Sequence, residues 1–155
     1  MKIIHFSDFN NDIINFIVNK NNSSFDYSGE ISDEKRAMLA VMNKAFSYLT
    51  TEEKELLKMK YVDCLNNNQI AEHFNRTSRN IRYRINKIMQ VDLTNIINAL
   101  LLNYKEILSA EESQIFEYYK LYRYTAKKIS KILEKDIRNV QHTIQIIDIK
   151  LKIEN

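Results

Sequence analysis

Apolar residues recur every three or four positions along most of this chain, which is the spacing of amphipathic helices. Two N-terminal stripes of this kind predict helices over residues 8–19 and 32–48. A polar stretch rich in Asn and Ser, residues 21–29, separates them and marks a boundary. A further apolar stripe predicts a linking helix over residues 95–107.

The rest of the chain repeats itself. Residues 49–88 align without a gap with residues 108–147 when they are shifted by 59 positions, and eight of the aligned pairs are identical. Each copy predicts three helices. Their expected limits are about 51–62, 67–74 and 78–90 in the first copy, and about 110–122, 126–134 and 136–152 in the second.

Each copy also opens with a helix-start signature. Thr50 is followed by Glu53, and Ser109 by Glu112, in the Ser/Thr-x-x-Glu order of a capping box. In that motif the hydroxyl and the carboxylate satisfy two backbone N–H groups, which stabilises a helix by about 1 kcal/mol. The same signature at the same place in both copies supports a true internal repeat.

The composition excludes several classes of protein. With one Gly and no Pro among 155 residues, β sandwiches and Gly-rich phosphate loops are excluded. Cys64 is the only cysteine and the three histidines lack metal-ligand spacing, so we expect no disulfide, no metal and no cofactor. No catalytic constellation stands out, and we expect no enzyme. Neither a signal peptide nor a membrane span is evident, so a cytoplasmic protein without membrane contact is expected.

The net charge is only +3, but it is distributed unevenly. Residues 1–34 hold two basic and six acidic side chains, which gives 2 − 6 = −4. Residues 76–87 hold five basic side chains and no acidic one, which gives +5. A basic segment within a nearly neutral chain is a local signal for contact with nucleic acid.

This basic segment belongs to a predicted pair of helices. Ile70 and Phe74 mark the apolar face of a short helix, and Ile81 and Ile85 mark that of the next, after a three-residue connection. Such a pair forms a helix-turn-helix, whose second helix enters the DNA major groove. The predicted DNA-binding residues are Arg76, Thr77, Ser78, Arg79, Asn80, Arg82, Tyr83, Arg84, Asn86 and Lys87.

The residue types suit double-stranded DNA. Arg can bridge guanine O6 and N7, and Asn can bridge adenine N6 and N7. Thr77 or Ser78, together with backbone N–H groups at the helix start, can hold a phosphate. Arg84 and Lys87 are better placed for the sugar-phosphate backbone. We therefore predict a sequence-specific DNA-binding regulator of transcription.

The expected fold is all-α, with tandem helix-turn-helix three-helix units and an N-terminal helical extension. The expected divisions are an acidic extension at 1–31, a first helix-turn-helix domain at 32–91, and a linking helix with a second helix-turn-helix domain at 92–155.

The first copy resembles the fourth conserved region of bacterial sigma factors, and the second is a weaker match. The similarity lies in Leu-Thr-Thr-Glu-Glu at 49–53, Gln-Ile-Ala-Glu at 69–72 and Thr-Ser at 77–78, with Ile81 and Ile85 following. In that family the second helix of the motif binds the −35 promoter element. The resemblance implies that bases face Ser78, Arg79, Arg82 and Tyr83, and that Thr77 caps the helix.

The chain departs from the family pattern at two places. The family has Gly and an apolar residue in the turn, where this chain has Asn75-Arg76 and Glu134-Lys135. Residues 1–48 are too short and too acidic for the polymerase-binding region that precedes region four. We therefore expect a small phage- or plasmid-type regulator, with RNA polymerase as a candidate second partner, and not a complete sigma factor.

The second copy is less suited to DNA, because Asp136 replaces Thr77 as the cap and its charge repels phosphate. Its candidate DNA contacts are Lys127, Lys128, Lys131, Lys135, Arg138, Asn139, Gln141 and His142. The alternative is a copy used for packing or for a homodimer through the C-terminal helix. That alternative depends on a coiled-coil-like stripe and a second apolar stripe. The first consists of Ile137, Val140, Ile144, Ile147 and Leu151, and the second of Ile146, Ile149 and Ile153.

Two other functions stay open at this point. One is a protein-interaction module that binds RNA polymerase or a sigma factor without contacting DNA, and the other is binding of structured RNA. Tyrosines 118, 119, 122 and 124 are expected to serve as core and interface residues rather than as a platform for bases.

Overall fold

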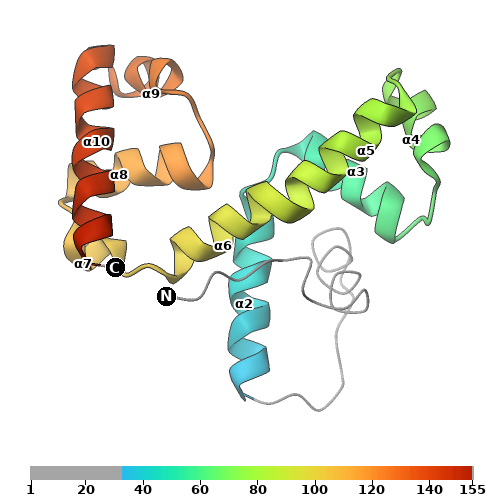
Figure 1. Ribbon diagram of the computed structural model, residues 1–155, viewed down its shortest axis with the longest axis horizontal. Coiled ribbons are helices and arrows are strands. Elements are labelled where there is room, and N and C mark those ends of the chain that lie inside the picture. Colours follow the sequence, from blue (N-terminus) through green and yellow to red (C-terminus); the bar gives the residue numbers. More distant parts are fainter. Residues whose placement is uncertain (1–32, 155) are drawn as a thin grey trace. The chain divides into compact units, whose positions relative to one another are not determined.

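The computed structural model describes residues 33–154, and the elements in this range are all helical (Figure 1). The expected all-α class is confirmed, since the described residues contain no strand. The helix expected over 8–19 and the extension at 1–31 lie outside the described residues.

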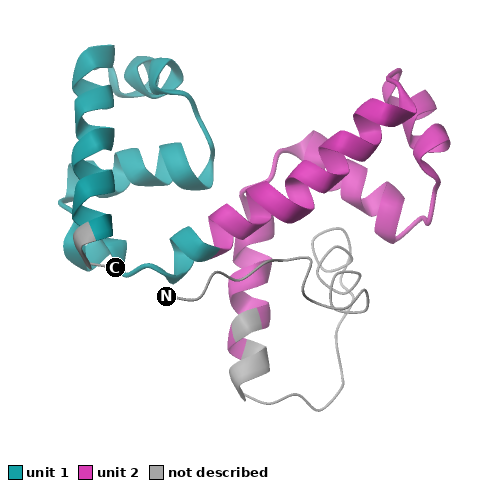
Figure 2. Cartoon of the chain, in the orientation of Figure 1, with its two compact units in different colours: residues 1–2, 98–155 teal, residues 3–97 magenta. Residues whose placement is uncertain are grey.

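The chain divides into two compact units between Ile97 and Asn98 (Figure 2). We refer to residues 33–97 as the N-terminal unit and to residues 98–154 as the C-terminal unit. The sequence predicted this boundary after residue 91. It lies later because the third helix of the first copy continues without a break into the helix that follows it.

The N-terminal unit is built around one uninterrupted helical stretch. Its helices are α2 (Asp33–Ser47), α3 (Thr51–Tyr61), α4 (Asn67–Phe74), α5 (Ser78–Lys87), the π-helical turn η2 (Ile88–Asp92) and the start of α6 (Leu93–Leu101). The last three follow one another without a break. The side chains that fill its core include Phe46, Leu56, Leu57, Ile70, Ile81, Leu93 and Ile96.

The linking helix expected over 95–107 is corrected in two ways. It begins earlier, as α6 at Leu93, because Leu93, Ile96 and Ile97 are buried and extend the apolar stripe of α5 through the π-helical turn. It also ends earlier, at Leu101, and a separate short helix, α7 (Tyr104–Ile107), follows.

The C-terminal unit consists of α7, α8 (Ala110–Phe116), the π-helical turn η3 (Glu117–Leu121), α9 (Ala126–Leu133) and α10 (Ile137–Glu154). Helix α10 packs against both α8 and α9 (Figure 1). In the first stripe, the side chains Val140, Ile147 and Leu151 are buried within this unit, Ile144 is half-buried and Ile137 is 38% exposed, so most of this stripe is core. Ile149, from the second stripe, is 58% exposed.

Several backbone features of the two copies match at the offset of 59 residues. Shifted by 59 positions, α4 coincides with α9 residue for residue, and the cap residues Thr50 and Asn66 coincide with Ser109 and Thr125. Both predicted capping boxes are present, and Asn66 forms a further one with Gln69.

The left-handed residues follow the same repeat. Among the described residues, those with positive φ are Cys64, Asn75, Arg123 and Glu134. They form two pairs at the 59-residue offset, Cys64 with Arg123 and Asn75 with Glu134. The two copies therefore share their turns as well as their helices.

Candidate nucleic-acid interface

The connection between α4 and α5 is closed by backbone and side-chain hydrogen bonds. Asn75 ends α4 in the left-handed conformation, at φ 53° and ψ 51°, and the N–H of Arg76 donates to the carbonyl of Ala71 at 2.9 Å. Asn tolerates this conformation better than most residues, as the sequence predicted. The hydroxyl of Thr77 then accepts the N–H of Asn80 at 3.1 Å, so Thr77 caps α5 as expected. The turn thus fixes the direction in which α5 leaves α4.

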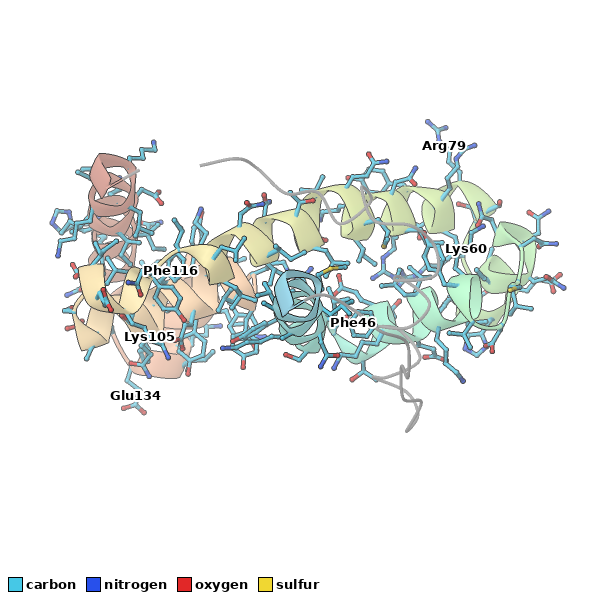
Figure 3. All side chains as sticks on the ribbon, turned by 90° about the horizontal axis from the view of Figure 1, so that it is seen from below. Phe46, Lys60, Arg79, Lys105, Phe116 and Glu134 are labelled. Atoms are coloured by element: carbon cyan, nitrogen blue, oxygen red, sulfur yellow. The ribbon has the colours of Figure 1, made fainter. Side chains whose placement is uncertain are left out.

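Helix α5 has a buried apolar face and an exposed polar one. Ile81 and Ile85 are buried in the core of the N-terminal unit. On the opposite side, Arg79, Arg82 and Asn86 are exposed, and Tyr83 is 65% exposed. Arg79 projects away from the ribbon (Figure 3). We call Arg79, Arg82, Tyr83 and Asn86 the α5 stripe, which the helical period brings to one face.

The other predicted residues of this copy lie around the stripe. Asn80 and Lys87 are exposed and Ser78 is half-buried. Arg79, Arg82 and Lys87 form no ion pair with any residue in the described part of the chain. Their positive charges are therefore available to a ligand.

Arg76 and Arg84, which were predicted to contact DNA, form ion pairs within the protein. Glu52, in the first turn of α3, accepts a hydrogen bond from Arg84 at 2.6 Å and forms an ion pair with Arg76 at 3.0 Å. The Arg84 side chain is only 23% exposed. The Glu52 carboxylate thus joins α3 to the turn and to α5, and it offsets part of the positive charge of these two side chains.

A shallow groove of about 280 Å³ lies along one flank of α5. Its lining comprises Glu53, Asn80, Tyr83, Arg84, Lys87, Ile88 and Asp92. Glu53 and Asp92 are buried carboxylic side chains. Because acidic groups lie in the groove, an anion such as a phosphate is favoured at its basic rim, where Lys87 is exposed, rather than inside it.

The second copy presents a different surface. Its predicted residues Lys127, Lys128, Lys131, Arg138, Asn139, Gln141 and His142 are exposed. Lys135 pairs with Glu111, which matches the Arg76–Glu52 pair of the first copy. Asp136 accepts the N–H of Arg138 at 2.7 Å and so caps α10, as expected.

The tyrosines were expected as core and interface residues. Tyr119 is 37% exposed and Tyr122 is 42% exposed, so these two are not core residues, while Tyr118 and Tyr124 are half-buried. The sequence carried a signal for this arrangement, because four tyrosines and four basic residues lie close together between 118 and 128. The role of Glu52 was also missed, although Glu52 and Glu111 repeat at matching positions.

No protein family, curated protein or solved structure matches this chain. Across residues 33–154, no helix combines the length and apolar character needed to cross a membrane. The same range contains no group of three or more His, Cys, Asp or Glu side chains arranged to hold a metal ion. The case for a function therefore depends on the residues of the two copies themselves.

Proposed function

We propose that this protein is a sequence-specific double-stranded DNA-binding regulator of transcription, and that α4 and α5 form its helix-turn-helix. In this proposal α5 lies in the major groove, as the resemblance to sigma-factor region four implies. The observation that carries it is the α5 stripe, in which two arginines without ion pairs among the described residues stand beside exposed Tyr83 and Asn86.

The dimensions and chemistry of α5 support this function. The helix has ten residues, about 15 Å of length at 1.5 Å per residue, which is enough to cross a groove about 12 Å wide. Guanidinium and amide side chains make the bidentate contacts by which guanine and adenine are recognised. The capped turn and the Glu52 ion pairs hold the helix on a rigid base, which favours specific contacts.

The exposed basic side chains have separate expected roles. We assign base contacts to Arg79 and Arg82, which belong to the stripe, and phosphate contact to Lys87, which lies at the rim of the groove. A base contact affects preference among sequences, whereas a phosphate contact affects all duplexes equally.

The experiment begins with selection of a preferred duplex from a random pool. Affinities for that duplex and for a scrambled one are then measured over a salt series for Arg79→Ala, Arg82→Ala and Lys87→Ala. Lys44→Ala is the matched control, because Lys44 is an exposed basic residue on α2. Each arginine variant should lose about 1–3 kcal/mol on the selected duplex and discriminate less against the scrambled one. Lys87→Ala should lower the salt slope by roughly one on both duplexes.

Two outcomes contradict the proposal. If both arginine variants bind like Lys44→Ala, the α5 stripe does not contact bases. If the protein shows no salt-dependent duplex binding but retains RNA polymerase in a pull-down, the protein-interaction function replaces the proposal. Competition by a structured RNA that exceeds that of duplex DNA would favour RNA as the ligand.

A further inference from the structure

The two copies carry their positive charge at different places. Segment 118–131 of the second copy has five basic residues and no acidic one, a charge of +5, namely Lys120, Arg123, Lys127, Lys128 and Lys131. The matching segment 59–72 has Lys60 against Asp63 and Glu72, which gives 1 − 2 = −1. At the next helix the first copy is the more basic one. Its segment 76–87 carries a charge of +5, whereas the matching segment 135–146 of the second copy carries 2 − 1 = +1.

Three aromatic rings are stacked within this basic segment. We call Tyr118, Tyr122 and Tyr124 the tyrosine cluster. The ring centroids of Tyr118 and Tyr124 are 5.8 Å apart with 18° between their planes, and those of Tyr122 and Tyr124 are 5.5 Å apart with 25°. Tyr118 and Tyr122 are 6.2 Å apart. The two pairs that contain Tyr124 have the geometry of offset stacking, whereas the planes of Tyr118 and Tyr122 are tilted by 42°.

The backbone of the repeat creates the cluster. After the π-helical turn η3, Arg123 takes the left-handed conformation at φ 61°, and the N–H of Tyr124 then donates to the carbonyl of Tyr118 at 2.9 Å. The first copy makes the same bond, from Leu65 to Met59 at 3.0 Å. At the position of Tyr122 the first copy has Asp63. The fold therefore does not require an aromatic ring at residue 122.

One lysine lies on the tyrosine cluster, and others lie near it in the sequence. The Nζ of Lys128 lies 3.8 Å from the ring centroid of Tyr124, and the Nζ of Lys120 lies 5.1 Å from that of Tyr119. Lys127 and Lys131 are exposed on α9 and form no ion pair within the described part of the chain. Their counterparts in the first copy are Asn68 and Glu72.

We propose that the C-terminal unit binds single-stranded nucleic acid, with an unpaired base stacked on Tyr122 and the adjoining phosphates held by Lys127 and Lys131. Exposed aromatic rings beside a basic surface are the combination that binds unpaired bases with little regard to sequence. A duplex hides the faces of its bases, so this surface favours single strands over double-stranded DNA. The site is independent of the α5 stripe, and the two proposals can fail separately.

The probes are a twelve-nucleotide oligo(dT) and an oligo(U) of equal length, each titrated against the full chain. With nine tyrosines and no tryptophan, the intrinsic emission of the protein comes from tyrosine, and stacking on Tyr122 should quench it. Anisotropy of the labelled oligonucleotide gives the affinity. Tyr122→Phe keeps the ring and Tyr122→Leu removes it. Lys127→Ala and Lys131→Ala are compared with Lys105→Ala, an exposed lysine of α7.

Tyr122→Phe should bind like the original chain, and Tyr122→Leu should bind roughly five- to hundredfold more weakly. Lys127→Ala and Lys131→Ala should each lower the salt slope by about 0.7, while Lys105→Ala should not. Tighter binding of oligo(dT) identifies single-stranded DNA as the ligand, and tighter binding of oligo(U) identifies RNA. Far-UV circular dichroism checks that each variant is folded.

The inference is overturned if neither oligonucleotide binds at low salt, or if Tyr122→Leu binds as well as Tyr122→Phe. It is also overturned if the double variant Arg79→Ala, Arg82→Ala loses oligonucleotide binding while Tyr122→Leu keeps it, since the ligand would then lie on α5. If the chain binds the oligonucleotides but no duplex, the proposed function is contradicted and the proposal for the tyrosine cluster is still supported.

Discussion

Replacing Glu134 with Gly should stabilise the C-terminal unit. Glu134 ends α9 at φ 53° and ψ 44°, where the Cβ of an L-residue is crowded against the backbone. The side chain is exposed and points away from the unit (Figure 3), so its removal costs no packing. The turn itself is preserved, because the N–H of Lys135 donates to the carbonyl of Ser130 at 2.9 Å through backbone atoms alone.

The magnitude follows from two opposing effects. The left-handed conformation costs an L-residue roughly 1–2 kcal/mol, and Gly removes that cost. Gly also makes the unfolded chain more flexible, which lowers the free energy of unfolding by about 0.4–1 kcal/mol. The expected net gain is therefore about 0–1.6 kcal/mol with a central value of about 0.8 kcal/mol, or a rise of about 3–6 °C in the Tm of a unit of this size. Asn75→Gly should gain less, because Asn tolerates the same conformation better than Glu.

The matched control is Glu134→Ala. A negative charge is unfavourable at the C-terminal end of a helix, and both substitutions remove it. Only Glu134→Gly also removes the Cβ. Urea unfolding followed by far-UV circular dichroism gives the free energy of unfolding, and hydrogen exchange of peptides from residues 98–154 assigns the change to the C-terminal unit. If Glu134→Gly is no more stable than Glu134→Ala, the backbone strain attributed to Glu134 is absent.

Two further predictions concern acidic residues at helix starts. The hydrogen bonds from Lys150 and from the N–H of Ser109 hold the pKa of Glu112 below its ordinary 4.5, so the stability it contributes is present above about pH 4.5 and is lost as the pH falls through the lowered pKa. Acid unfolding should therefore show a smaller pH dependence in Glu112→Gln, and an unchanged acid profile would contradict this. Glu52→Gln should release Arg76 and Arg84, raise non-specific duplex affinity and steepen its salt slope by about 1–2, whereas an unchanged slope would mean that neither side chain reaches DNA.

The sequence predicted those parts of the fold that depend on short-range signals. The capping boxes that begin at Thr50 and Ser109 were predicted, because each is complete within four residues, whereas the equally short one that begins at Asn66 was missed. Helix α4 was predicted to the residue, because Asn75 marks its end by its own conformational preference. The position of the α5 stripe followed from the period of the helix and the buried residues Ile81 and Ile85.

The features that were missed depend on contacts between distant residues. The pattern around Arg84 indicates only that it lies beside the stripe, while its partner Glu52 is 32 residues earlier in the chain. The π-helical turns η2 and η3 carry no residue type that marks them. Cys64 and Arg123 are left-handed although neither residue type favours that conformation. Their positions follow from the closure of the turn around them.

Comparison of the two copies separates what the scaffold needs from what a ligand needs. The matched features are determinants of the backbone: the first caps of each copy, the left-handed residues that follow them, and the ion pair that joins the first helix to the turn. The surface charge is not matched, since it is concentrated on 76–87 in one copy and on 118–131 in the other. A scaffold requirement would place the charge at equivalent positions. The backbones of the two copies match, but their positive charges lie at non-equivalent positions. Two different ligand geometries explain this difference best. We therefore assign base-pair recognition to the first copy and binding of unpaired bases to the second.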